Sequence, residues 1–181
     1  MVKSIQRRAR PSMLLFGVLV IAAYAFGCGD DDGGNGTPAA GEASFEISGE
    51  IEATKQGQAS FVRTDSTLNI SFHDNETFSL SLLRTGDDTS IPSEGAYTIG
   101  SVGAADFHVV YTAYVDGDVT ISQEYTNWDG ESGHLVIVDA DEDSATGVFD
   151  FQAWRYDENF ERLDEAQISV SSGEFTAHLS K

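Results

Sequence analysis

The chain contains a single cysteine, Cys28, and no sequence motif of a familiar enzyme active site. One thiol excludes an internal disulfide, and the four histidines lack the H-x-H or H-x-x-x-H spacing of a zinc site. A G-x-S-x-G nucleophile elbow and a Gly-rich phosphate loop are also missing. We therefore expect no cofactor and no enzymatic activity. Glycoside hydrolysis by a carboxylate pair stays an alternative, because the separation of the two carboxylates in space decides it.

Positive charge is scarce in this chain. Its 181 residues include 10 Lys and Arg against 30 Asp and Glu, for a net charge of −20. Nucleic-acid binding needs Lys and Arg to meet the phosphates, so the composition argues against a nucleic-acid partner. It also argues against docking on anionic lipid headgroups. A surface this acidic keeps a protein soluble, and it is typical of proteins from salty environments.

No apolar run is long enough to cross a bilayer. The longest, residues 13–26, has 14 residues, fewer than the roughly 20 that a transmembrane helix needs. A basic segment precedes this run, and Ala25 and Gly27 lie three and one positions before Cys28. The arrangement resembles a bacterial lipoprotein signal peptide. The alternatives are a membrane-spanning helix and a cysteine buried in the protein core.

The resemblance implies that residues 1–27 are removed and that lipid, palmitate included, is attached to Cys28. Four of the 10 basic residues lie before Cys28, so removal leaves 6 against 30 acidic residues and a net charge of −24. Acyl chains then supply the membrane attachment, since each buried methylene contributes about 0.8 kcal/mol. We expect an exported protein anchored to the outer membrane, on its periplasmic or its cell-surface face.

Residues 28–41 are rich in glycine and contain no large apolar residue. We expect them to form a flexible tether with a reach of roughly 20 Å. The acidic run at residues 30–32 resembles the export signals that carry Bacteroidota lipoproteins to the outer face of the outer membrane. The alternative interpretation is that these three carboxylates only keep the tether solvated.

Residues 42–181 are predicted to form one domain in which apolar and polar side chains alternate. Phe45 and Ile47, for example, alternate with Glu46 and Ser48. A period of two indicates half-buried strands. The pattern predicts strands at residues 45–51, 59–63, 67–72, 77–82, 95–100, 107–115, 118–125, 133–138, 146–154, 166–170 and 174–179.

Turn signals join several of these strands into hairpins. The polar break at residues 73–76 separates two strands, and Asp116-Gly117 between two apolar runs is a strong hairpin signal. The spacing of Phe160 and Leu163 within residues 158–165 predicts a loop with one turn of helix. The predicted fold is all-β, an antiparallel β-sandwich or flattened barrel of about 9–11 strands.

The C-terminal third carries three strand motifs in succession. They read Ser-Gly-His-Leu-Val-Ile at 132–137, Gly-Val-Phe-Asp-Phe at 147–151 and Ile-Ser-Val-Ser-Ser-Gly-Glu-Phe at 168–175. Together with Gly-Ala-Tyr at 95–97, they resemble the strands of β-rich Bacteroidota lipoprotein domains of unknown function. The resemblance covers about half of the predicted domain. It implies an all-β fold in the cell envelope and transfers no catalytic residue.

One acidic loop has a spacing known from calcium sites. Asp139, Asp141 and Asp143 follow the D-x-D-x-D pattern that places carboxylates around Ca²⁺ in an EF-hand. Ser144 stands where that loop needs a glycine, and Asp150 stands where it needs a glutamate. We expect a solvated hairpin loop without a built metal site, with weak Ca²⁺ binding as the alternative.

Aromatic residues offer a different binding chemistry. Trp128, Trp154 and Tyr156 lie at predicted strand ends or in loops, where flat rings can stack on sugar rings. The alternative is that Trp154 caps the core and Trp128 packs on a loop. We expect a binding or structural component of the cell envelope, with a protein or a glycan as its partner. A surface carbohydrate-binding module is the alternative function, and the sequence leaves the oligomeric state open.

Overall fold

The computed structural model describes residues 38–87 and 89–180, and within them the fold is all-β. Residues 1–37 lie outside this description, and with them the expected signal peptide and Cys28. The described strands are β1 (Glu42–Gly49), β2 (Ala53–Arg63), β3 (Thr67–His73), β4 (Phe78–Thr85), β5 (Gly95–Gly100), β6 (Phe107–Val115), β7 (Asp118–Thr126), β8 (Glu131–Ala140), β9 (Ser144–Tyr156) and β10 (Arg162–Leu179).

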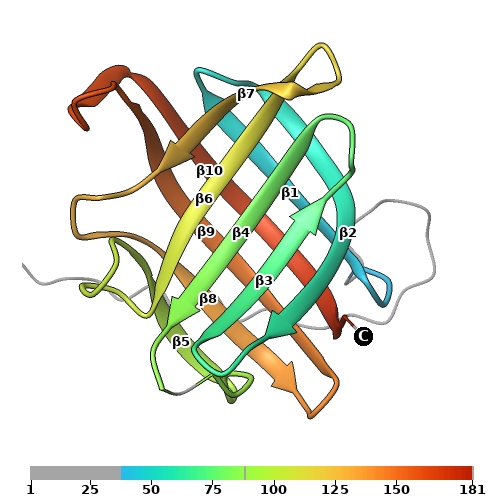
Figure 1. Ribbon diagram of the computed structural model, residues 1–181. Coiled ribbons are helices and arrows are strands. Elements are labelled where there is room, and N and C mark those ends of the chain that lie inside the picture. Colours follow the sequence, from blue (N-terminus) through green and yellow to red (C-terminus); the bar gives the residue numbers. More distant parts are fainter. Residues whose placement is uncertain (1–37, 88, 181) are drawn as a thin grey trace, which may run out of the picture. The chain divides into compact units, whose positions relative to one another are not determined.

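The strands form a sheet that closes on itself as a flattened barrel (Figure 1). One wall runs β1-β2-β3-β4-β6 through antiparallel pairs, and the other runs β1-β10-β9-β8. The two walls share β1, and two further strands join them on the other side of the barrel. At one end β7 pairs with β6 and β9, and at the other end β5 pairs with β6 and β8.

The alternating sequence pattern fills the interior with apolar side chains. On β3, Leu68, Ile70 and Phe72 are buried, and the residues between them face outward. Rings from both walls meet inside: Phe45 lies 5.2 Å from Phe78, and Phe72 stacks on Phe149 at 5.1 Å. Burial of this apolar surface is the main stabilising contribution to the fold.

Both predicted hairpin turns are present. β3 and β4 are antiparallel neighbours across residues 74–77. Asp116 and Gly117 have φ angles of 53° and 74°, as a tight two-residue turn between β6 and β7 requires.

The predicted helical turn at residues 158–165 is wrong. The Asp157 carboxylate accepts the backbone N–H groups of Asn159 and Glu161, each at 2.8 Å, and so caps a turn. Phe160 has a φ of 62°, in the left-handed region that a right-handed helix does not use. The chain then enters β10 at Arg162.

Residues 38–41 already belong to the sheet's hydrogen-bond network. Gly41 donates its N–H to the Thr176 carbonyl at 2.8 Å, and its own carbonyl accepts the Ala59 N–H at 2.8 Å. The Thr176 hydroxyl donates to the Pro38 carbonyl at 3.3 Å. The last four residues of the expected tether are therefore attached to the barrel.

The outer surface of β2, β3, β4 and β6 has an unusual composition. The strand registers place twelve side chains in three rows on the outer side of these strands, and none is Asp, Glu, Lys or Arg. One of the twelve, His108, is itself buried. We call this set the neutral face. Its rows are Ser60, Ser71, Ser81 and Val110; Gln58, His73, Ser79 and Thr112; and Val62, Asn69, Leu83 and His108.

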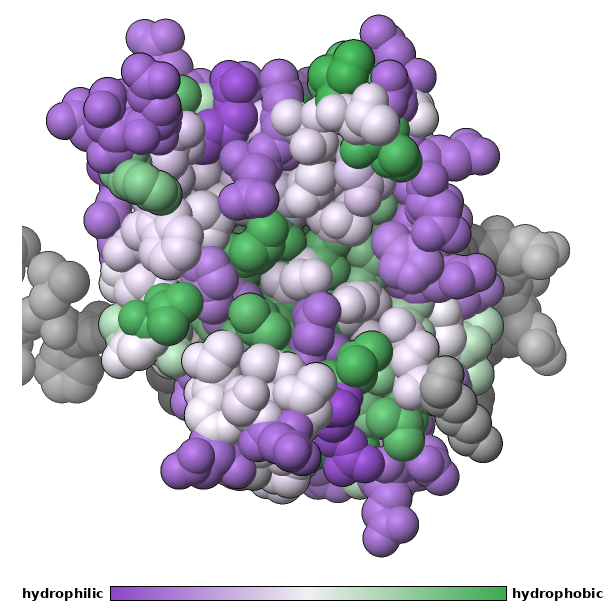
Figure 2. Space-filling view, in the orientation of Figure 1, coloured by the Kyte–Doolittle hydropathy of each residue, from purple (hydrophilic) through white to green (hydrophobic). Residues whose placement is uncertain are grey.

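Figure 2 shows this side of the barrel, where pale and green residues occupy most of the centre and purple residues gather toward the margins. The opposite wall differs. Its outward positions include three carboxylates, Glu46, Glu174 and Asp150, that alternate with buried apolar residues on their strands. In a chain with 30 acidic residues, the neutral face is therefore a local departure from the composition of the whole.

Candidate functional site

The structure brings the three predicted aromatic residues together at one corner of the barrel. Trp128 lies in the loop between β7 and β8, while Trp154 and Tyr156 lie at the end of β9. The backbone N–H of Trp128 donates to the Tyr156 hydroxyl at 3.1 Å. Trp154 pairs with Thr126, the last residue of β7. Residues that the sequence selected one by one as possible stacking residues are therefore neighbours in space, although Trp128 and Tyr156 are 28 positions apart in the chain.

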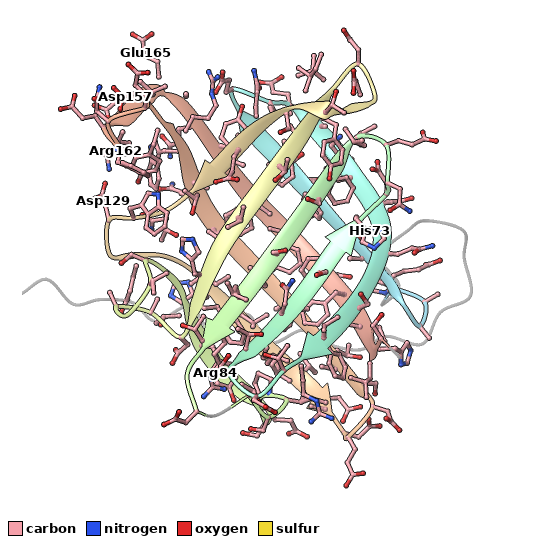
Figure 3. The ribbon with its side chains drawn as sticks, in the orientation of Figure 1. His73, Arg84, Asp129, Asp157, Arg162 and Glu165 are labelled. Carbon is pink, nitrogen blue, oxygen red and sulfur yellow. The ribbon has the colours of Figure 1, made fainter. Side chains whose placement is uncertain are left out.

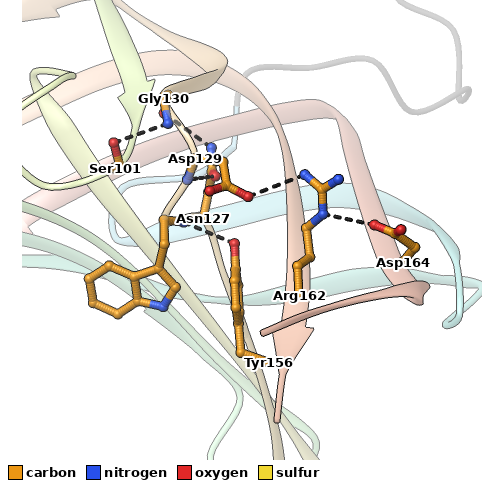
Figure 4. Close-up of polar contacts among 8 residues, drawn as sticks. Ser101, Asn127, Asp129, Gly130, Tyr156, Arg162 and Asp164 are labelled. Atoms are coloured by element: carbon orange, nitrogen blue, oxygen red, sulfur yellow. Dashed lines mark hydrogen bonds and ion pairs between the residues drawn. The ribbon is translucent and has the colours of Figure 1, made fainter. Parts of the chain in front are cut away.

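The three rings do not form a shared stacking surface. The Arg162 guanidinium lies 5.1 Å from the centre of the Trp154 ring and covers one of its faces. Arg162 is held there by Asp164 at 2.9 Å and by Asp129 at 3.3 Å (Figure 4). These carboxylates raise the pKa of Arg162, and the largest cause is the hydrogen bond that Arg162 donates to Asp164. Figure 3 shows Arg162 and Asp129 at this corner, away from His73.

Trp128 is the exposed member of the group. Its side chain is 47% exposed, and its ring lies 4.9 Å from the imidazole of His108 at an angle of 36°. No ring contact in the described residues joins two of Trp128, Trp154 and Tyr156. Sugar stacking on these three residues therefore stays a prediction.

A buried polar cluster lies beneath the Trp128 loop. In the described part of the chain, the buried polar residues are Ser101, His108, Thr126 and Asn127. His108 Nδ1 donates to the Gly100 carbonyl at 3.1 Å, and Nε2 lies 3.0 Å from the Thr126 hydroxyl. That hydroxyl donates to the Val109 carbonyl at 2.7 Å. These bonds join β5, β6 and β7 where the two walls meet.

The loop itself is tied to this cluster. Asn127 Nδ2 donates to the Gly130 carbonyl at 3.2 Å, and Asn127 Oδ1 accepts the Asp129 N–H at 2.7 Å. Gly130 donates its N–H to the Ser101 hydroxyl at 3.1 Å (Figure 4). The bonds of His108, Thr126 and Ser101 join separate strands or loops and those of Asn127 fix the loop, so the role of the cluster is structural. No sequence pattern marked His108, Thr126 or Ser101, because their partners lie on other strands or loops.

The acidic loop between β8 and β9 uses one of its carboxylates as a turn cap. Asp141 Oδ1 accepts the backbone N–H groups of Asp143 at 2.8 Å and Ser144 at 2.7 Å. These two hydrogen bonds are the largest causes that hold the pKa of Asp141 below its usual value. No group of three or more His, Cys, Asp or Glu among the described residues is placed to hold a metal ion.

We predict that this loop responds to cations without selecting Ca²⁺. Its crowded carboxylates are relieved by screening, so the thermal midpoint should rise about equally with Ca²⁺, Mg²⁺ and NaCl of matched ionic strength. Asp141→Asn keeps an oxygen that accepts both N–H groups, and the three responses should stay parallel. Differential scanning fluorimetry measures them. A saturable rise with Ca²⁺ alone, lost in Asp141→Asn, would show a real metal site.

Two adjoining hollows, which no sequence pattern indicated, meet at the β3–β4 turn: the smaller lies on the neutral face, and the larger lies beside it over β1 and β2. The smaller has a volume of about 290 Å³ and the larger about 540 Å³, and His73 and Asn75 line both. The polar side chains of the smaller hollow belong to Ser71, His73, Asn75, Ser79, Ser81 and Tyr114. The larger hollow adds Glu42, Ser44, Gln56, Gln58 and Asp74.

The turn between β3 and β4 gives these hollows a fixed wall. Asp74 Oδ1 accepts the backbone N–H groups of Glu76, Thr77 and Phe78 at 3.0, 2.7 and 3.0 Å. Burial alone would raise the pKa of Asp74, but these bonds and one from the Thr77 hydroxyl outweigh it and lower the pKa to about 2. The carboxylate is thus ionised and occupied by the turn, and it holds Asn75 at a φ of 64°.

No protein-family model, curated protein or solved structure matches this chain. The part of the chain that the structure describes contains no helix with the length and apolar character of a membrane span.

Proposed function

We propose that this protein is a lipid-anchored, exported binding component of the cell envelope, without enzymatic activity. The observation that carries the proposal is the N-terminal sequence: a basic segment, a 14-residue apolar run, and small residues before Cys28. An internal disulfide offers no other use for this thiol, because the chain contains no second cysteine.

The barrel supports a binding role on its outside. Large apolar side chains, among them Phe61, Tyr111 and Phe175, fill the interior between the walls. A packed interior leaves the outer surface and the loops for contacts with other molecules. The two adjoining hollows are on that outer surface. The acidic surface keeps the barrel apart from anionic headgroups, so the acyl chains hold it at the membrane.

Replacing Cys28 by serine tests the anchor. Cys28→Ser removes the thiol that takes the lipid, so the variant should incorporate no labelled palmitate and should leave the membrane fraction or accumulate unprocessed. Gly29→Ser is the matched control, because it changes the neighbouring residue and leaves the thiol in place. Metabolic labelling followed by fractionation measures both variants. Retention of label by Cys28→Ser would overturn the proposal.

A further inference from the structure

The hydrogen-bonding groups of the neutral face include no carboxylate, ammonium or guanidinium group. Serine and threonine hydroxyls and the amides of Asn69 and Gln58 donate and accept hydrogen bonds without carrying a charge, and the imidazole of His73 adds ring nitrogens that can hydrogen-bond. Val62, Leu83 and Val110 add aliphatic surface between them. A surface of hydroxyls, amides and small apolar patches complements a molecule with the same mixture, namely one with many hydroxyl groups on a carbon framework.

Charge narrows the class of ligand. A net charge of −20 repels anionic polymers at long range, and the neutral face has no Lys or Arg to compensate for that repulsion. A cationic partner would find its counter-charges outside the neutral face, at Asp65, Glu76 and Asp116 in the turns, at Asp118 on β7 and at Glu42 in the larger hollow. An uncharged ligand meets neither obstacle.

A peptide partner is disfavoured by the topology. Extended peptides commonly bind by adding a strand to an exposed sheet edge. The strands β2, β3, β4 and β6 each have a hydrogen-bonded neighbour on both sides, so they offer no free edge. Side chains, and not backbone groups, must therefore make the contacts on this face, which again suits hydroxyl-rich molecules.

The hollows provide a path for a chain-like ligand. At about 290 Å³, the smaller hollow is near the lower limit of small-molecule sites, which span roughly 300–1,000 Å³. It adjoins the larger hollow at His73 and Asn75, so a linear ligand can extend from one to the other. Tyr114 lines the smaller hollow and provides an aromatic ring that can pack against the apolar face of a sugar.

Just beneath this face, two buried polar atoms have no hydrogen-bond partner in the protein. Four buried side-chain atoms in the described residues lack a partner, and two of them, Asn69 Oδ1 and His73 Nδ1, belong to the neutral face. Asn69 Nδ2 donates to the Ser81 hydroxyl at 3.4 Å, which leaves its oxygen unbonded. Unsatisfied buried groups are uncommon because each costs about 1–3 kcal/mol, and they call for a specific explanation.

We propose that the neutral face binds an uncharged glycan chain. Ser71, Ser79 and Ser81 bond its hydroxyls, His73 and Asn75 bond it where the two hollows meet, and the Tyr114 ring packs on one sugar unit. This proposal rests on the proposed function, of which it names the ligand class. It places the glycan site away from the aromatic corner that contains Trp128 and Trp154.

Calorimetric titration of the purified full chain, kept in a sugar-free detergent, tests the site. The probes are three neutral hexasaccharides, maltohexaose, cellohexaose and laminarihexaose, with polygalacturonate as the anionic comparison. We expect at least one neutral probe to bind in the micromolar to millimolar range and polygalacturonate not to bind. The measurement does not depend on lipidation, so the anchor and the glycan site succeed or fail separately.

Two variants locate the binding. Ser81→Glu places a carboxylate in the smaller hollow and should weaken binding at least tenfold. Ser171→Glu is the matched control, since Ser171 is an exposed outward-facing serine of β10 on the opposite wall, and it should leave the affinity unchanged. Tyr114→Ala removes the ring from the smaller hollow without adding a charge, and it should also weaken glycan binding at least tenfold.

Several outcomes would overturn the proposal. One is the absence of binding by all three neutral probes at about 5 mM, a concentration beyond the millimolar end of the expected range. Another is an equal effect of Ser81→Glu and Ser171→Glu. A third is loss of binding in Trp128→Ala with no loss in Ser81→Glu, which would return the site to the aromatic corner. A crosslinker at Ser81 that captures a single envelope protein, with no glycan binding, would instead assign the face to a protein partner.

Discussion

Replacing Phe149 by alanine is expected to lower the free energy of unfolding by about 3–5 kcal/mol. The Phe149 side chain is 4% exposed, and its ring contacts four others from both walls of the barrel. Their centres lie 5.8 Å away for Phe45, 5.1 Å for Phe72, 6.3 Å for Phe151 and 6.2 Å for Phe175. Alanine removes the ring's apolar surface and leaves a cavity that the surrounding sheet cannot close.

Guanidinium unfolding of the full chain, followed by far-UV circular dichroism, measures this loss. Val148→Ala is the control, because Val148 is the preceding residue of β9 and faces outward with 41% of its side chain exposed. Its effect should stay within about 0.5 kcal/mol. Equal losses in the two variants would mean that the barrel interior is not packed around Phe149.

The alternating sequence pattern predicted the all-β fold because burial on one face of a strand leaves a direct trace in the sequence. β3 and β4 show this best, with apolar residues at every second position and polar residues between. The sequence also predicted the Asp116-Gly117 turn, since both residues adopt positive φ readily.

The pattern failed where the interior position is not filled by an apolar side chain. β2 begins at Ala53, six residues before the predicted start. The prediction missed this part of the strand because Lys55 and Gly57, which are not large apolar residues, occupy its early inward positions. Lys55 Nζ donates to the Thr77 hydroxyl at 2.9 Å and lies 5.5 Å from the centre of the Phe78 ring. A lysine in that role carries no apolar signal.

Local irregularity obscured the last strand. Two short strands were predicted near the C-terminus, whereas β10 runs unbroken from Arg162 to Leu179. Its register against β9 shifts between Val170 and Gly173, and Ser172 has a φ of 52°. This bulge changes which residues face inward and breaks the alternation without ending the strand.

The candidate sites were less predictable than the fold, because they depend on pairing between strands. Trp154 looked available for stacking, but Arg162 from the next strand covers one face of its ring. Ser71 and Ser81 are ordinary polar residues within their own strands. Only the register that sets them side by side, next to Ser60 and Val110, produces a continuous uncharged surface.

Gly133→Ala is expected to lower the free energy of unfolding by about 3 kcal/mol, near the upper end of the usual range for overpacking. Gly133 pairs with Phe151 across β8 and β9, where the two backbones approach closely. An added Cβ would lie 2.0 Å from the Asp150 carbonyl oxygen and 2.5 Å from the Phe151 Cα atom. Both are backbone atoms, so a rotamer change cannot relieve the clash, and β8 must move away from β9.

The neighbouring residue provides a matched control for this prediction. Ser132→Ala introduces the same side chain one position earlier, and it removes a hydroxyl oxygen that is buried without a hydrogen-bond partner. Loss of an unsatisfied polar atom should leave stability unchanged or raise it. Guanidinium unfolding compares the two variants. If Gly133→Ala proves as stable as Ser132→Ala, β8 and β9 do not approach as closely as the structure requires, and the closure of the barrel through β8 must be revised.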